Sequence, residues 1–164
     1  EGKAYILTAA HVVDEDQENI EIYLQSLQNQ GKSTKLDNEQ GIPAKIVAYS
    51  ERPKNVNENA GNPDKKDLAL LELTPNSFQM EQIKRRGYVQ IAPPDFKIKE
   101  GDRAVFVGCP QGNFYVRGCQ IYKINTNVGT DSLLIDNDPY PGQSGGGLFV
   151  NGTLCTLLRT AKLL

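Results

Sequence analysis

Gly142-Gln143-Ser144-Gly145-Gly146 stands directly before the apolar run Gly147 to Val150, and this junction is the most informative stretch of the chain. Glycines on both sides of Ser144 let the backbone adopt sharp or left-handed conformations. Such a turn can direct the amides of Gly142 and Ser144 into one concavity, an oxyanion hole, with Gln143 between them. Glycine-rich segments that contain serine are also common in ordinary loops, so this string needs support from elsewhere in the chain.

Two strings upstream supply the partners that a serine nucleophile needs. Thr8-Ala9-Ala10-His11 ends one apolar run, and Asp67-Leu68-Ala69-Leu70-Leu71 places a carboxylate at the start of another. A serine hydroxyl is a weak nucleophile that requires a base, and the base requires a group that fixes its tautomer. His11, the single histidine of the chain, is the candidate base, and Asp67 is its candidate partner. Taken singly, these strings are more often a strand end and a solvated cap, but their order matches one order of the catalytic triad.

The periodicity of the chain is that of short strands separated by turn formers such as Glu100-Gly101-Asp102 and Asn151-Gly152. Apolar, β-branched and aromatic runs occur at Tyr5 to Leu7, Ile20 to Leu24, Lys45 to Tyr49, Leu68 to Leu73, Arg103 to Val107, Gln120 to Ile124, Leu133 to Ile135 and Gly147 to Val150. A helical pattern is present only over Ser77 to Arg86. Many short strands at this spacing predict an all-β sandwich or barrel.

Pro93-Pro94-Asp95 is a stiff, extended connector that divides the pattern into two halves. We expect an N-terminal unit over residues 1–92 that carries His11 and Asp67, and a C-terminal unit over residues 93–164 that carries Ser144. The polar stretch Glu51 to Lys66 is predicted to be an exposed loop between the His and Asp strings.

Composition narrows the classes of partner. The chain has 164 residues and a formal net charge of −2, a near balance that argues against nucleic acid or an acidic membrane as the main partner. No run approaches the ~20 apolar residues that span a bilayer. The three cysteines lack C-x-x-C spacing, which with one histidine argues against a zinc site. Cys109 and Cys119 flank a predicted turn, so they either form a disulfide across a hairpin or remain reduced thiols like Cys155.

With these three motifs the chain resembles the trypsin/chymotrypsin-like serine proteases, and it is more similar to the bacterial HtrA (Deg) branch than to the digestive enzymes. Val107-Gly108-Cys109-Pro110-Gln111-Gly112 is similar to the G-x-P-x-G turn of that branch. The resemblance implies two antiparallel β-barrels with the active site in the cleft between them. It also implies a serine endopeptidase that cleaves polypeptides through an acyl-enzyme without a cofactor, and it favours a periplasmic or secreted location.

The sequence departs from the family in places that matter for function. Gln143 stands where the digestive enzymes have an aspartate that pairs with a new N-terminus, so activation by that ion pair is not expected. The first barrel is expected to lack its opening strand, and Asn151 to Leu158 lacks a glycine that relatives carry before the substrate-pairing strand. Terminal strands would then be missing. The alternatives are therefore a non-catalytic, protease-like domain that binds peptides or a partner, and a truncated, inactive fragment.

Asp138 is the candidate substrate-binding residue. It lies six residues before Ser144, the position at which a carboxylate selects Lys or Arg in trypsin. The alternative is an exposed turn in Asp136-Asn137-Asp138-Pro139-Tyr140-Pro141, where the prolines reshape the loop, and this second interpretation is favoured.

Overall fold

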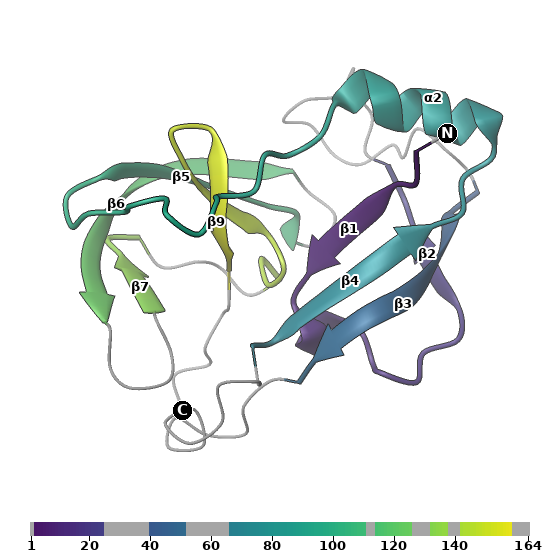
Figure 1. The fold of residues 1–164 in the computed structure, drawn as a ribbon, viewed down its shortest axis with the longest axis horizontal. Helices are drawn as coiled ribbons and strands as arrows, with labels where there is room; N and C mark the ends of the chain where they lie inside the picture. Colours follow the sequence, from purple (N-terminus) through teal and green to yellow (C-terminus); the bar gives the residue numbers. More distant parts are fainter. Residues whose placement is uncertain are drawn as a thin grey trace.

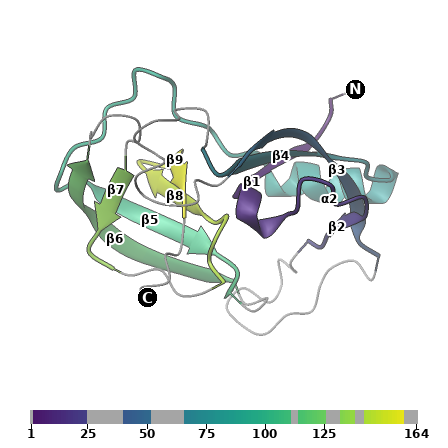
Figure 2. The ribbon, with the colours of Figure 1, turned by 90° about the horizontal axis from the view of Figure 1, so that it is seen from below.

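A computed structural model describes residues 2–24, 40–51, 66–110, 114–125, 132–137 and 142–158, and these form two antiparallel sheets (Figures 1 and 2). The first sheet has the order β1-β4-β3-β2 and consists of β1 (Tyr5–Thr8), β4 (Leu68–Leu73), β3 (Ile42–Ser50) and β2 (Ile20–Ile22). The second has the order β7-β6-β5-β8-β9 and consists of β7 (Ser132–Ile135), β6 (Tyr115–Asn125), β5 (Arg103–Gly108), β8 (Gly147–Val150) and β9 (Thr153–Leu157). The expectation of an all-β fold is confirmed.

The first sheet is built on its inner strand β4, along which buried and partly exposed residues alternate. Ala69, Leu71 and Leu73 point to the buried face, because successive side chains of a strand alternate between its two faces. On the other face, Glu72 lies opposite Tyr5 of β1 and Lys45 of β3. The strand therefore separates an apolar core from a charged surface.

The second sheet has its own core, centred on Phe106 of β5, which is completely buried. Side chains from four other strands surround it, together with the segment before β5. Strands β8 and β9 form a hairpin whose turn residues, Asn151 and Gly152, have φ values of 52° and 78°. Two successive positive φ values are typical of the type I′ turn that joins antiparallel strands. Sequence reasoning recognised this turn but did not predict β9.

The helix α2 (Ser77–Arg86) follows β4 and lies beside the first sheet (Figure 1). Asn76 begins it with a capping box: its side chain accepts the N–H of Gln79, and the Gln79 side chain accepts the N–H of Asn76. Ile83 buries the helix against the first core. The helical pattern over these residues is thus confirmed as a helix with the same bounds.

The segment after α2 connects the two halves of the molecule. Ala92 donates its N–H to Leu154 O at 2.9 Å, and Leu154 donates to Gln90 O at 2.8 Å. This places the segment parallel to β9 of the second sheet, just before the proline pair. A boundary between residues 92 and 93 stays a prediction.

Cys109, Cys119 and Cys155 are free thiols in the structure. The register of the β5–β6 hairpin explains why Cys109 and Cys119 do not pair. Cys119 lies opposite Ala104, near the start of β5, whereas Cys109 follows the end of that strand. Of the two alternatives for these residues, the structure contains the reduced form.

Within the described parts of the chain, no helix combines the length and the apolar character needed to cross a membrane.

Candidate active site

His11 lies in a tight turn directly after β1. The 3-10 helix η1 (Ala10–Val12) is closed by hydrogen bonds from Val12 N to Ala9 O and from Val13 N to Ala10 O, both 3.1 Å. Ala9 and Ala10 are fully buried. Small side chains at these positions allow the turn to pack closely on the core, while 23% of the His11 side chain remains exposed.

Asp67 directly precedes β4, and its side chain contacts the imidazole of His11. Its carboxylate is completely buried, with Oδ2 and Oδ1 at 2.9 and 3.0 Å from His11 Nδ1. Oδ1 also accepts the backbone N–H of His11 at 3.0 Å. A carboxylate accepts but does not donate when ionised, so the imidazole hydrogen belongs on Nδ1 and Nε2 keeps its lone pair. The pair is therefore arranged so that His11 can act as a base through Nε2.

The backbone of Asp67 is held in an uncommon conformation. Its φ of 56° lies in the left-handed region, which few residues other than glycine occupy. Its N–H donates to Glu51 O and its carbonyl accepts from Ala10 N, both at 3.1 Å. These bonds tie the start of β4 to the end of β3 on one side and to the His11 turn on the other.

The Ser144 string forms a turn that begins with Gly142, at a φ of 89°. Gly146 N donates to Gln143 O at 3.0 Å, which closes the turn around Ser144. Gly145 N donates to Leu158 O at 3.0 Å, and Leu158 N donates to Gly146 O at 2.7 Å. The turn is thus fixed to the end of β9, and Ser144 itself is half-buried.

The two halves of the candidate site meet at Gly145. A Cβ atom added there would overlap the Oγ1 of Thr8 and would lie 3.3 Å from Ala9 N. The serine string therefore packs directly on the residues that lead to His11. This agrees with Figure 2, where β1 lies on the side of its sheet that faces the second sheet. The structure brings the His and Asp strings into hydrogen-bond contact and the Ser string against the His string.

A second contact supports the turn from within the C-terminal half. Gln143 is completely buried, and a Cβ atom at Gly108 would lie 3.2 Å from its Cγ. A Cβ atom at Gly146 would overlap the carbonyl oxygen of Val107. The close approach of Val107 O therefore requires glycine at position 146. Gly108 in turn packs closely against the Gln143 side chain. In the sequence the Val107-Gly108 pair stands out only as part of the Val107 to Gly112 motif, which does not predict its contact with the serine turn.

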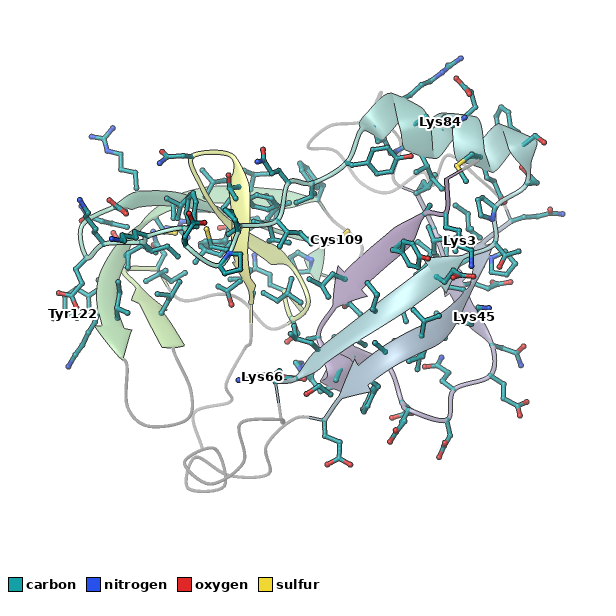
Figure 3. All side chains as sticks on the ribbon, viewed as in Figure 1. Lys3, Lys45, Lys66, Lys84, Cys109 and Tyr122 are labelled. Carbon is teal, nitrogen blue, oxygen red and sulfur yellow. The ribbon has the colours of Figure 1, made fainter. Side chains whose placement is uncertain are left out.

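Cys109 is the other nucleophilic side chain near this junction, and Figure 3 places it between the two sheets. Cys109 is an exposed residue, but partial desolvation of its thiol raises the pKa above its ordinary value, so the thiol stays protonated at neutral pH. Because the thiolate is the reactive form, Cys109 is the poorer candidate nucleophile.

Asp138 and most of the Glu51 to Lys66 stretch lie outside the described residues. Within the parts of the chain that are described, no group of three His, Cys, Asp or Glu residues could hold a metal ion.

Comparison with known proteins places this geometry in a family. A family model described as a trypsin-like peptidase domain matches residues 1–154. The structure of the HtrA-type protease AlgW with a tripeptide is similar, with a TM-score of 0.59 and 21% identity over 92% of this chain and 40% of that chain. The Rv3671c protease of M. tuberculosis H37Rv, in an inactive form, gives 0.57 and 22% over 92% of this chain and 64% of that one.

The structural likenesses show a shared fold, and the chain spans less than two thirds of the length of either protein. A search of curated proteins finds no match to the sequence. The family model covers nearly the whole chain, and the all-β architecture of two antiparallel sheets agrees with it. The chain therefore belongs to the trypsin-like peptidase domain family.

Proposed function

We propose that this chain is a serine endopeptidase in which Ser144 is the nucleophile, His11 the general base and acid, and Asp67 the group that orients His11. The observation that carries the proposal is the buried Asp67 carboxylate bonded to His11 Nδ1 at 2.9 Å, next to a serine turn that packs on the His11 strand. A triad requires a carboxylate bonded to the Nδ1 atom of its histidine, and the contact of Asp67 with His11 supports that part of the proposal.

The reaction follows from these positions. Ser144 Oγ attacks the carbonyl carbon of the scissile peptide bond while His11 Nε2 removes its proton. The tetrahedral intermediate collapses when His11 gives that proton to the leaving amine, which leaves an acyl-enzyme on Ser144. Water then attacks the ester with His11 again as the base, and the second product is a carboxylic acid. Asp67 stays ionised and stabilises the imidazolium that forms in each half of the reaction.

The oxyanion hole is assigned to the turn from Gly142 to Ser144. The amides of Gly145 and Gly146 donate to Leu158 O and Gln143 O, so they are committed to the fold. The amides of Gly142 and Ser144 are therefore assigned to the oxyanion hole, and the buried side chain of Gln143 lies between them in the turn. Loss of one such donor typically lowers turnover by ~10²–10³.

The substrate class follows from the family and from the proposed reaction: a polypeptide that reaches the junction between the two units, residues 1–92 and 93–164. No step of this reaction requires a cofactor. Asp138 stays a candidate substrate-binding residue, for which the exposed turn is the favoured interpretation.

Labelling with a fluorophosphonate probe tests the proposal, because the probe reacts only with a serine that a base has activated. We expect the chain and a Ser77→Ala control on α2 to be labelled, and Ser144→Ala and His11→Ala to remain unlabelled. Labelling that persists in Ser144→Ala would refute the assignment of the nucleophile. A chain that melts cooperatively but is never labelled would instead indicate a non-catalytic peptide-binding domain or an incomplete site.

A further inference from the structure

We propose that Ser50 is a positioning residue for the His11–Asp67 pair, and that it acts through the backbone of Lys66. This inference rests on the proposed function, since it assigns a role within the same site.

The end of β3 contacts Asp67 and its preceding residue on one side and the residue before His11 on the other. Ser50, the last residue of β3, accepts the backbone N–H of Lys66 with its Oγ at 2.7 Å. The next carbonyl along the strand, that of Glu51, accepts the N–H of Asp67 at 3.1 Å. On the other side, the Tyr49 hydroxyl lies 3.5 Å from Ala10 O in the His11 turn. Three successive residues therefore hold the segment before Asp67 and the segment before His11.

The conformation of Asp67 explains why this support is needed. With a φ of 56°, Asp67 occupies a region that an L-residue leaves unless the surrounding structure holds it there. The bond from Asp67 N to Glu51 O fixes the peptide plane before this residue, and the bond from Ala10 N to Asp67 O fixes the plane after it. The bond from Lys66 N to Ser50 Oγ fixes the residue before Asp67, and so aligns Asp67 N with Glu51 O. Removal of the Ser50 hydroxyl frees Lys66 and loosens the plane before Asp67. A rotation about the Asp67 backbone then turns the carboxylate away from His11 Nδ1.

The same contact contributes little to the core. Lys66 is exposed and Ser50 is only half-buried, so water can satisfy the Lys66 N–H when the hydroxyl is absent. A water molecule replaces the hydrogen bond but does not fix its direction. We therefore expect loss of Ser50 to affect the geometry of the pair more than the stability of the fold.

The test uses the sole histidine of the chain as a spectroscopic probe that does not depend on activity. In protein labelled with ¹⁵N-histidine, the Nδ1 proton bonded to Asp67 should give one resonance downfield of the amides. We expect this resonance in the unmodified chain, in Ser50→Thr, which keeps the hydroxyl, and in the Ser77→Ala control. In Ser50→Ala it should move upfield or broaden by exchange with water while cooperative melting is preserved.

Peptide hydrolysis provides the second measurement. Misplacement of the orienting group should lower kcat about tenfold to a hundredfold in Ser50→Ala, with KM within about twofold and recovery in Ser50→Thr. If Ser50→Ala does not fold, Ser50→Val replaces it, because valine matches threonine in shape and lacks only the hydroxyl. An unchanged Nδ1 proton in a folded variant without the hydroxyl overturns the inference. If the Nδ1 resonance shifts in Ser50→Ala but the unmodified chain has no peptidase activity, the role of Ser50 is supported and only the proposed function is refuted.

Discussion

At the scale of single residues, Asp67 combines two uncommon properties. Its side chain is a completely buried carboxylate and its backbone is left-handed, and it contacts His11 through both carboxylate oxygens. A buried carboxylate is costly unless it is bonded, and the imidazole and the His11 amide supply those bonds. The buried Asp67 carboxylate is therefore the acceptor around which the candidate site is organised.

Asp67→Asn tests this role with the smallest change in shape. Asparagine tolerates the left-handed region, so the fold should persist. The amide nitrogen offers a donor to Nδ1 and favours the wrong imidazole tautomer, which in triads of this type lowers kcat by ~10⁴. The measurement is kcat on a peptide substrate, with circular dichroism as the control for folding. A loss smaller than tenfold would show that Asp67 does not orient the base.

Sequence reasoning identified candidate site residues because each of the three strings is local. The string Thr8 to His11 can be recognised without knowledge of any contact. Ser50 and the contact between Thr8 and Gly145 were not predicted, because their roles depend on neighbours that are distant in the chain. No local pattern distinguishes the serine that ends β3 from any other serine at the end of a strand.

At the scale of elements, the outer face of the first sheet carries a charged cluster across three strands. Glu72 of β4 contacts Lys3 Nζ at 3.0 Å and Lys45 Nζ at 3.4 Å, and Tyr5 OH donates to it at 3.3 Å. The hydrogen bond from Lys3 is the main cause that lowers the pKa of the Glu72 carboxyl, and the same contact raises the pKa of Lys3. This cluster links the start of β1 to β4, at the end of β1 that is farther from the His11 turn.

The cluster makes a definite prediction for stability against pH. Because the folded pKa of Glu72 is lowered from 4.5, its contribution is complete above that value and is lost as the pH falls through the folded pKa. Glu72→Gln should therefore flatten the acid limb of the unfolding midpoint in urea, measured from pH 7 to about pH 3. The difference should shrink in high salt, which screens exposed pairs. Equal acid limbs for the two proteins would contradict the prediction.

Strand prediction succeeded where an apolar run was clearly delimited and failed where it was not. The six residues of β4 were predicted with their correct bounds because they form an apolar run, interrupted only by Glu72, between Asp67 and Thr74. Strand β9 was missed because two threonines divide Thr153 to Leu157 and the segment follows a turn that also suits a loop end. Strand β6 is longer than predicted because pairing with β5 extends it over Tyr115 to Cys119, where exposed side chains interrupt the apolar pattern.

At the scale of the whole molecule, the described residues form two separate cores, and Gly145, next to the candidate nucleophile, lies where the second half packs on the first. Its φ of 82° already favours glycine. The overlap of any Cβ atom with Thr8 adds a steric reason that is independent of φ. Position 145 is therefore restricted to glycine both by its own backbone conformation and by its contact with Thr8 in the other half.

Gly145→Ala and Gly152→Ala together separate these two causes. Gly152 has a similar φ of 78° with nothing within 4 Å of an added Cβ, so it should lose only the ~1–2 kcal/mol of the left-handed penalty. Gly145→Ala should lose that amount and a further ~1–3 kcal/mol from overpacking, together with probe labelling. Chemical denaturation gives both values. Similar losses in the two variants would show that the halves do not pack against each other at this glycine.

The left-handed backbone at Asp67 also has a consequence for directed evolution of this chain. A library selected only for survival at high temperature should replace Asp67 with asparagine, which tolerates the left-handed backbone, buries no charge and keeps an oxygen that accepts the His11 amide. A library selected for hydrolysis should keep aspartate at position 67 and should have a lower melting temperature. Deep sequencing of the two selected pools should therefore show their first difference at codon 67.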